Sequence, residues 1–333
     1  MMARILVTGS AGHLGEALMR TFQAAARAAI GVDRVASDYT DVVGSIVDPQ
    51  IVARCMDGVD VVIHAATLHK PHVATHGSQE FIDTNVTGTS KLLEAAVRAG
   101  VRAFIYTSTT SAFGDALVPG PGAPAAWITE DVAPVAKNIY GVTKVAAEEL
   151  CALAHRNSGL PSLILRTSRF FPEPDDDAAA RAAYADANLK ANEFLHRRVD
   201  VEDVVSAHLC ALERAPVLGF GRYIISATTP FRREDADELR RDAPSVVRRR
   251  VPAWEAIYSR RHWRMAPTID RVYDNTRARA ELCWEPRHDF GAVVARASTG
   301  DIRSPLARAI GIKGYHGTAF ADGLYPVVGD GGR

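Results

Sequence analysis

Tyr140 and Lys144 are separated by one helical turn in the stretch YGVTK, so both side chains would lie on the same face of a helix. A phenol has a pKa of about 10 and is a poor base at neutral pH. An ammonium group one turn away favours the phenolate. Lowering that pKa to about 7 needs roughly 4 kcal/mol, and one close cation in a half-buried site supplies much of this. The pair is suited to proton transfer, although the Tyr-x-x-x-Lys pattern alone is common.

Three glycines follow a short apolar run in residues 4–15, which read RILVTGSAGHLG. The run Ile5–Val7 indicates a strand buried on both faces, and a helical pattern follows. In a dinucleotide-binding loop, Gly9 allows the tight turn, Gly12 lets a pyrophosphate approach the backbone, and Gly15 lets the helix pack close to the strand. The phosphates would lie at the helix N-terminus. Glycine turns without a ligand are also common. The cofactor-binding residues expected here are Gly9, Gly12, His13, Leu14 and Gly15.

A second apolar run, Ala28–Val32, ends in Asp33. A carboxylate at the tip of the second strand accepts hydrogen bonds from the adenosine ribose and repels a 2′-phosphate. Asp33 therefore favours NAD over NADP. The neighbouring Arg34 leaves the alternative open, since arginine can serve a 2′-phosphate, and a solvated aspartate at a strand end is a third interpretation.

The remaining pattern is that of an α/β protein, with a Rossmann-type doubly wound parallel sheet and a smaller C-terminal lobe that binds the substrate. Further strands are expected at Val42–Gly44, Val59–Ala66 and Val101–Ser108. Helices are expected from Asp48-Pro49, over Gln79–Gly100, and from Tyr140 to about His155. Leu117–Pro134 is rich in Pro, Gly and Ala and indicates a long surface loop. The hydroxyl cluster Thr107–Ser111 follows a parallel strand, where ligands bind in such sheets, although turns also use Ser and Thr.

The segment Thr67–Gly77 is polar and holds three histidines and a lysine. His72 and His76 have a spacing that suits a metal on a helix, but Pro71 and Gly77 favour a loop. No carboxylate or thiol joins them in the sequence, so we expect no metal site. His69 and Lys70 are candidate substrate-facing groups, and a solvated loop is the alternative.

The composition limits the class of protein. The 333 residues are 47% hydrophobic, and 39 basic residues balance 39 acidic ones. This balance predicts no nucleic-acid partner and no anionic membrane surface. The four cysteines are far apart and fit neither a metal site nor a disulfide framework, so reduced thiols in a cytoplasmic protein are expected. Met1–Met2 leads directly into the first strand, and we expect no signal peptide and no membrane span.

Together these motifs resemble the extended short-chain dehydrogenase/reductases, the NAD-dependent epimerase/dehydratase group. The resemblance covers about residues 3–170, resumes at Val199–Val205 and returns weakly at Asp274–Phe290. It is carried by the glycine loop, Asp33, the strand end His64–Ala66, the stretch Asn85–Thr89, the cluster Thr107–Gly114 and the Tyr140/Lys144 pair.

The resemblance implies roles at the matching positions. Tyr140 would be the general acid/base, Lys144 would hold the nicotinamide ribose and tune Tyr140, and Thr109 would hydrogen-bond the same substrate oxygen. A positively charged nicotinamide would favour the Tyr140 phenolate further. The implied cofactor is NAD, and its binding residues would also include Ser45, Ile46, Ala65, Ala66, Asn85 and Thr107. Relatives in this family often form homodimers through two helices per subunit, here Gln79–Gly100 and Tyr140–His155.

Three departures from the family pattern narrow the reaction. Dehydratases carry Asp-Glu where this chain has Thr110 and Ser111, so dehydration is disfavoured. Arg169 replaces a substrate-side Asn. If it faces the pocket, it suits a carboxylate or phosphate, and an ion-paired arginine is the alternative. The segment 170–198 is short, Ala-rich and helical in pattern, without the strand that grips a nucleotide in epimerases.

We therefore expect an NAD-dependent oxidoreductase that acts on a secondary alcohol or lactol of a small, sugar-like, anionic substrate, with Thr109, Thr110, Arg169, His69 and Lys70 on the substrate. A nucleotide-sugar epimerase is the alternative, and a non-catalytic NAD-binding regulator is a minor one. The dinucleotide-binding unit would comprise residues 1–168 and 196–228, and the substrate lobe and tail residues 169–195 and 229–333. The Gly-rich tail after Lys313 has no functional interpretation.

Overall fold

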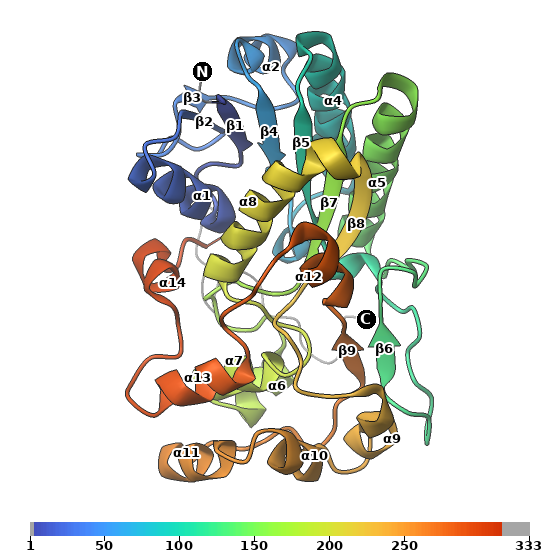
Figure 1. Ribbon diagram of the computed structural model, residues 1–333, viewed down its shortest axis with the longest axis vertical. Coiled ribbons are helices and arrows are strands. Elements are labelled where there is room, and N and C mark those ends of the chain that lie inside the picture. The colour runs from blue at the N-terminus through green and yellow to red at the C-terminus, as the bar shows by residue number, and fades with distance from the viewer. Residues whose placement is uncertain (1–2, 315–333) are drawn as a thin grey trace.

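Seven parallel strands form the central sheet in the computed structural model, which describes residues 3–314 (Figure 1). Their order across the sheet is β3-β2-β1-β4-β5-β7-β8, so the chain moves first to one side of β1 and then to the other. The bounds are β1 (Ile5–Thr8), β2 (Ala29–Asp33), β3 (Val42–Val43), β4 (Val61–His64), β5 (Ala103–Thr109), β7 (Ser162–Thr167) and β8 (Phe220–Ile225). Ligands bind beyond the carboxyl ends of the strands near such a reversal.

Helices cover both faces of this sheet, because apolar side chains of its buried strands point to both sides. One face packs on α1 (His13–Ala24) and α8 (Val201–Leu218). The other packs on α2 (Pro49–Met56), α4 (Gly88–Ala99) and α5 (Ile139–Ser158). Asp48 caps α2 by accepting a hydrogen bond from the Gln50 N–H at 2.8 Å. The predicted doubly wound parallel fold is confirmed.

The helix predicted over 79–100 has the expected extent but is not continuous. It consists of α3 (Ser78–Phe81), a π-helical turn η2 (Ile82–Thr87) and α4, and it ends at Gly100 in the left-handed conformation. The π turn contains the buried Asn85. Such turns are rare, occur often at functional sites, and have no signal in hydrophobic periodicity.

Two segments predicted as loops contain regular structure. Residues 117–134 include β6 (Ala126–Ile128), which pairs in parallel with β9 (Arg271–Tyr273). The expectation of an irregular loop there is wrong because a strand partner from a distant part of the chain satisfies its backbone. Residues 67–77 include a short 3-10 helix, η1 (Lys70–Ala74), whose first turn accommodates Pro71 without losing a hydrogen bond.

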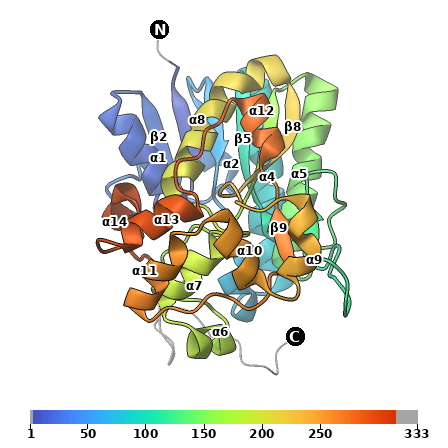
Figure 2. The same ribbon diagram turned by 60° about the horizontal axis from the view of Figure 1, so that its bottom comes forward.

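A smaller lobe lies across the carboxyl ends of the strands, below the sheet in Figure 1 and toward the viewer in Figure 2. Residues 170–198 contribute the predicted helices and no extended strand, only an isolated bridge between Arg169 and Arg198. The lobe has its own buried core, separate from those on the sheet. Its helices, with those that join it to the sheet, are α6 (Ala178–Ala183), α7 (Asp186–Glu193), η4 (Arg233–Asp235), α9 (Ala236–Leu239), α10 (Ala243–Arg250), α11 (Trp254–Arg261), α12 (Thr276–Leu282), α13 (Phe290–Ala297) and α14 (Pro305–Ile310).

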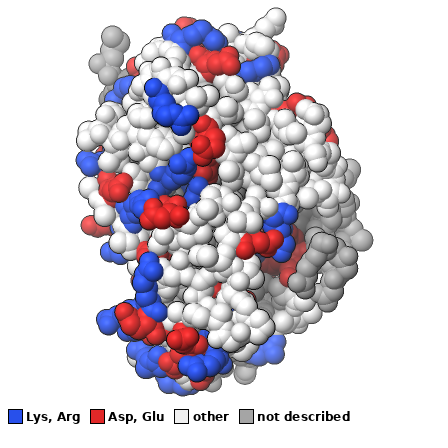
Figure 3. Space-filling model, turned by 90° about the vertical axis from the view of Figure 1, so that its right-hand side faces the viewer, with Lys and Arg blue, Asp and Glu red and all other residues white. Residues whose placement is uncertain are grey.

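The predicted residue bounds of the two units remain a prediction. The tail that follows Lys313 lies, apart from Gly314, outside the described residues. None of the four cysteines, all of which lie within residues 3–314, is in a disulfide, and Cys55 and Cys151 are buried. On the face shown in Figure 3, basic side chains lie next to acidic ones rather than in blocks of one sign. Among residues 3–314, no helix combines the length and apolar character needed to cross a bilayer.

Candidate active site

A cavity of about 750 Å³ opens at the carboxyl ends of the strands. Every predicted site residue except Asn85 lines it, although these residues are spread from Gly9 to Arg169 in the sequence. The predicted residues that line it are Gly9, Gly12, His13, Leu14, Gly15, Asp33, Ser45, Ile46, Ala65, Ala66, His69, Lys70, Thr107, Thr109, Thr110, Tyr140, Lys144 and Arg169.

The glycine loop forms one end of this cavity and fits the pyrophosphate of a dinucleotide. Gly9 has a φ of +76°, which favours glycine. A Cβ added to Gly15 would lie 1.9 Å from the carbonyl oxygen of Gly9, so only glycine lets α1 pack this close to the turn. Helix α1 begins at His13, and its first N–H groups lack a side-chain cap. A phosphate placed there would find unpaired backbone donors and the positive end of the helix dipole.

Asp33 closes the loop from the end of β2. One carboxylate oxygen accepts a hydrogen bond from the Ala11 N–H at 3.0 Å, and the other accepts one from the Val35 N–H at 2.9 Å. The carboxylate therefore fixes the shape of the glycine turn while it lines the cavity. This second contribution of Asp33 was not apparent from the sequence.

The backbone of Ala65 and Ala66 is positioned by a buried network that the sequence analysis missed. The Thr8 hydroxyl lies 2.7 Å from His64 Nδ1, and His64 Nε2 lies 2.9 Å from the Thr89 hydroxyl. Thr8 also accepts a hydrogen bond from the Ala66 N–H at 3.1 Å. Burial lowers the pKa of His64 to about 3, so the ring is neutral and structural. A histidine at the end of an apolar strand is the only sequence signal for this network.

Asn85 does not line the cavity, and its side chain connects two segments that do. Its Oδ1 accepts a hydrogen bond from the Leu68 N–H at 2.8 Å, and its Nδ2 donates one to the Thr143 hydroxyl at 3.0 Å. Thr143 lies on α5 between Tyr140 and Lys144. Asn85 thus positions these two segments, and its expected contact with the cofactor stays a prediction.

Tyr140 lies in the first turn of α5, where Asn138 caps the helix through the Gly141 N–H at 3.1 Å. The phenol is buried and hydrogen-bonded to the side chain of Thr109. Burial raises the pKa of Tyr140 to about 12, and the hydrogen bond with Thr109 opposes this only in part. The groups of the protein alone therefore hold the phenol protonated, contrary to the expectation that Lys144 lowers this pKa.

The reason lies in the environment of Lys144. Its ammonium donates a hydrogen bond to the carbonyl oxygen of Thr107 at 2.7 Å and lies 4.2 Å from the centre of the Tyr106 ring. Burial lowers the pKa of Lys144 to about 7, whereas Glu148, one turn farther along α5, raises it. Glu148 is fully buried and is held by Arg166 at 2.7 Å and by the Ser108 hydroxyl at 2.6 Å. This carboxylate supports the ammonium form of Lys144.

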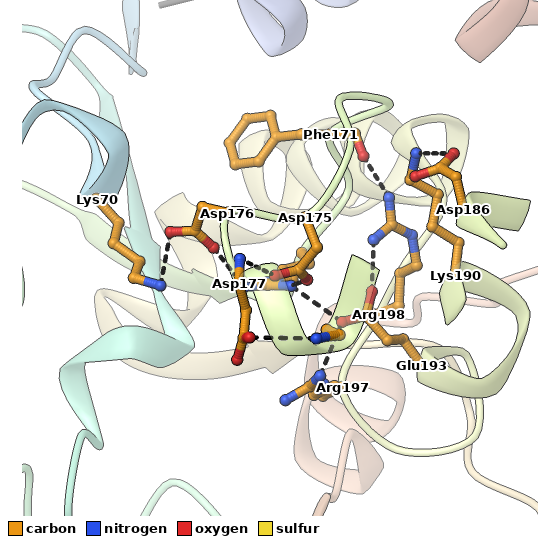
Figure 4. Close-up of polar contacts among 12 residues, drawn as sticks. Lys70, Phe171, Asp175, Asp176, Asp177, Asp186, Lys190, Glu193, Arg197 and Arg198 are labelled. Atoms are coloured by element: carbon orange, nitrogen blue, oxygen red, sulfur yellow. Dashed lines mark hydrogen bonds and ion pairs between the residues drawn. The ribbon is translucent and has the colours of Figure 1, made fainter. Parts of the chain in front are cut away.

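One side of the cavity is bordered by a network of ion pairs (Figure 4). The guanidinium of Arg169 contacts Asp175, Asp176 at 3.4 Å and Glu193 at 3.1 Å. Burial would lower the pKa of Arg169, but these carboxylates raise it above its usual value. Arg169 thus lines the cavity and is ion-paired, and its contact with a substrate anion stays a prediction.

The same network reaches across the cavity mouth. Lys70, on η1, forms an ion pair with Asp176 at 2.7 Å, and 46% of its side chain is exposed. The ring of His69 lies 6.2 Å from the Tyr140 ring and 5.5 Å from the Phe171 ring, between centres. Burial lowers the pKa of His69 well below its usual value, so this ring is neutral. Within residues 3–314, no group of three or more His, Cys, Asp or Glu side chains is arranged to hold a metal ion.

The chain is similar in sequence and in fold to known proteins. The family model described as "NAD dependent epimerase/dehydratase family" matches residues 5–223. A 3-beta-hydroxysteroid dehydrogenase from Mycolicibacterium neoaurum is 24% identical, over 86% of this chain and 87% of its own. A UDP-glucose 4-epimerase from Azospirillum brasilense is 25% identical, over 94% and 96%. A solved short-chain dehydrogenase/reductase superfamily protein from Agrobacterium tumefaciens, with bound NAD, matches with a TM-score of 0.63 and 23% identity, over 89% of this chain and 97% of that one. This structural likeness shows a shared fold.

Proposed function

The chain belongs to the NAD dependent epimerase/dehydratase family, and from this premise we propose that it oxidises a secondary alcohol or lactol of a small, sugar-like, anionic substrate. The family makes it an NAD-dependent enzyme of the short-chain dehydrogenase/reductase type. The observation that carries the proposed reaction is the hydrogen-bonded pair of Tyr140 and Thr109, buried in the cavity that the glycine loop also lines.

In this proposal the side chains of the protein remove the proton of the substrate hydroxyl. The chemistry that bound NAD would supply is acceptance of a hydride from the carbon that bears the hydroxyl group. Tyr140, in its phenolate form, takes the proton of that hydroxyl, and Thr109 orients the same oxygen by a hydrogen bond. Lys144 would hold the nicotinamide ribose. Because the buried phenol of Tyr140 is protonated in the protein alone, oxidation depends on positive charge near it, and Lys144 supplies part of that charge as an ammonium supported by Glu148.

Two features support a small anionic substrate. Residues 170–198 form two short helices and no extended strand that could grip a nucleotide. Basic side chains outnumber acidic ones among the residues that line the cavity. Among the described residues, Arg169 has three carboxylate partners, whereas Lys70 has an ion pair with Asp176 alone and a more exposed side chain, so Lys70 is better placed to receive a carboxylate or phosphate. Thr110 and Ser111 offer no carboxylic acid for dehydration.

The second candidate is a nucleotide-sugar epimerase, favoured by the relative from Azospirillum brasilense, which matches nearly the whole chain. A non-catalytic NAD-binding regulator remains a minor candidate, and the presence of both Tyr140 and Lys144 argues against it.

The test is a screen for NADH formation at 340 nm, with NAD and a panel of free sugars, sugar acids, nucleotide sugars and a 3β-hydroxysteroid. We expect turnover of a free sugar or sugar acid. Interconversion of a nucleotide sugar without net NADH, detected by chromatography, would favour the epimerase. Oxidation of the steroid alone would keep the reaction class but contradict the anionic, sugar-like substrate. NAD binding without turnover of any compound in the panel would favour the regulator.

We further propose a cytoplasmic homodimer in which the helices at 79–100 and 140–155 of each subunit meet. These helices pack on each other and expose Val97, Val142 and Leu153. Light scattering of the purified protein, with Val142→Lys as the disrupting variant, tests the dimer. We also propose that residues 1–168 and 196–228 form the dinucleotide-binding unit, and that residues 169–195 and 229–333 form the substrate lobe with the tail.

A further inference from the structure

We propose that Lys313, near the C-terminal limit of the described residues, is a binding residue for the pyrophosphate of the dinucleotide. The residue lies 298 positions after Gly15 in the sequence, but it lines the same cavity as Gly12 and Gly15. The inference rests on the NAD dependence of the family and not on the identity of the substrate.

The backbone of Lys313 is fixed beside the glycine loop. The N–H groups of Lys313 and Gly314 both donate hydrogen bonds to Glu173 Oε1, at 3.1 and 3.2 Å. The same oxygen lies 2.7 Å from Nε2 of His13, the first residue of α1. The side chains of His13 and Glu173 are only 4% and 2% exposed. This buried contact ties the segment around Lys313 to the start of α1.

The anchor persists at neutral pH. Burial would raise the pKa of Glu173, but hydrogen bonds from His13 and from the Lys313 N–H hold it below its usual value. Glu173 is therefore an ionised acceptor under ordinary conditions. An ionised acceptor binds N–H donors more strongly than a neutral one, so the position of the Lys313 backbone is well defined.

The side chain of Lys313, in contrast, has an exchangeable partner. Its ammonium forms an ion pair with Glu16, in the first turn of α1, and 22% of the side chain is exposed. Glu16 has a second cationic partner, because its other oxygen lies 2.7 Å from Arg20 Nε. If the ammonium turned from Glu16 to a phosphate, the carboxylate would still be neutralised by Arg20. The exchange leaves no buried charge without a partner.

A phosphate at this end of the cavity would gain from the exchange. The glycine loop offers backbone N–H groups and the partial charge of the helix dipole, whereas Lys313 adds a full positive charge. A charge-assisted hydrogen bond to a phosphate is stronger than a neutral one. Lys313 thus combines a fixed backbone with a movable ammonium beside the loop.

The experiment measures the dissociation constant of NADH by fluorescence titration for the wild type, Lys313→Met and Glu16→Gln. We expect Lys313→Met to weaken binding by about 10- to 100-fold, as for loss of a charge-assisted hydrogen bond. We expect Glu16→Gln to leave binding unchanged or tighter, because it releases Lys313 for the phosphate. Arg308→Met is the matched control. Arg308 lies in the same C-terminal segment, on α14, and donates to the Arg303 carbonyl oxygen, away from the cavity.

A second measurement separates phosphate binding from folding. Adenosine and ADP-ribose both compete with NADH, but only ADP-ribose carries the pyrophosphate. Lys313→Met should weaken ADP-ribose by the same factor as NADH and leave adenosine unchanged. The proposal is overturned if Lys313→Met binds NADH like the wild type, if Glu16→Gln weakens binding as much as Lys313→Met does, or if adenosine is weakened equally. If the wild-type protein bound no NADH, that result would instead contradict the assignment of NAD as the cofactor.

Discussion

The ammonium of Lys144 donates a hydrogen bond to the carbonyl oxygen of Thr107 at 2.7 Å, although Lys144 and Tyr140 share one face of α5. The Thr107 hydroxyl in turn lies 2.9 Å from His208 Nε2, on α8. Lys144 is therefore held against the end of β5. Through Thr107, these contacts connect α5 on one face of the sheet to α8 on the other. Its charge is set by its burial and by Glu148 and not by the tyrosine.

This arrangement predicts a pH dependence of stability. The pKa of Lys144 is lowered from 10.5 to about 7 in the folded chain. Between these values the unfolded chain binds the proton that the folded chain has lost, so the contribution of Lys144 to stability increases with pH. The free energy of unfolding of the wild type, relative to Lys144→Met, should rise by about 1.4 kcal/mol per pH unit from about 7.5 to 9.5. Urea titrations at three pH values, without cofactor, measure this difference. A constant difference would contradict the lowered pKa.

Replacement of Tyr140 by phenylalanine removes the group that takes the proton. We expect turnover to fall at least about 100-fold, because general acid–base catalysis contributes at least that factor. The affinity for NADH should stay largely intact. Steady-state rates and fluorescence titration measure the two quantities, and Tyr184→Phe, outside the cavity, is the control. Loss of NADH binding together with turnover would indicate that Tyr140 has a structural role.

Asp33→Asn tests the selectivity between NAD and NADP, and it retains one of the two oxygens that accept the hydrogen bonds from Ala11 and Val35. Removing the negative charge should strengthen NADPH binding at least about tenfold, because like charges placed together cost more than 1.4 kcal/mol. NADH binding should weaken. Titrations with both cofactors measure the ratio, and Asp38→Asn, exposed and outside the cavity, should not change it. An unchanged ratio would assign selectivity to another residue, with Arg34 as the first candidate.

Gly15→Ala forces a Cβ into the 1.9 Å space next to the Gly9 carbonyl oxygen. Overpacking against backbone should lower the free energy of unfolding by at least about 2 kcal/mol and abolish tight NADH binding, because α1 must move away from the turn. Gly120→Ala is the matched control, since a Cβ there meets no atom within 4 Å, and its effect should stay within about 0.5 kcal/mol. Equal stability of the two variants would show that the loop adjusts without cost.

Local sequence patterns predicted those parts of the site whose geometry is local. The glycine loop, the strand ends and the Tyr140/Lys144 pair are each set by neighbours in the chain, and the parallel sheet brings them to one edge. Contacts between distant segments could not be predicted in this way. The ion pairs of Arg169 with Glu193, the network around His64, and the pairing of β6 with β9 each depend on where separate segments meet in space. The pKa of Tyr140 could not be predicted either. The sequence places Lys144 near Tyr140, but it does not show how completely the phenol is buried.

The core of the smaller lobe draws on three stretches of chain that are far apart, around Ala125, around Phe194 and from Ala227 to Ile302. In a chimaera, the last stretch alone could be replaced by that of a relative. Its new side chains would then pack against the unchanged first and second stretches, and the core would be mismatched. Exchange of all three stretches together keeps the interior matched and leaves the glycine loop, β5 and α5 of this chain unaltered. Transfer of this interior from a relative therefore requires the coordinated exchange of three separate segments.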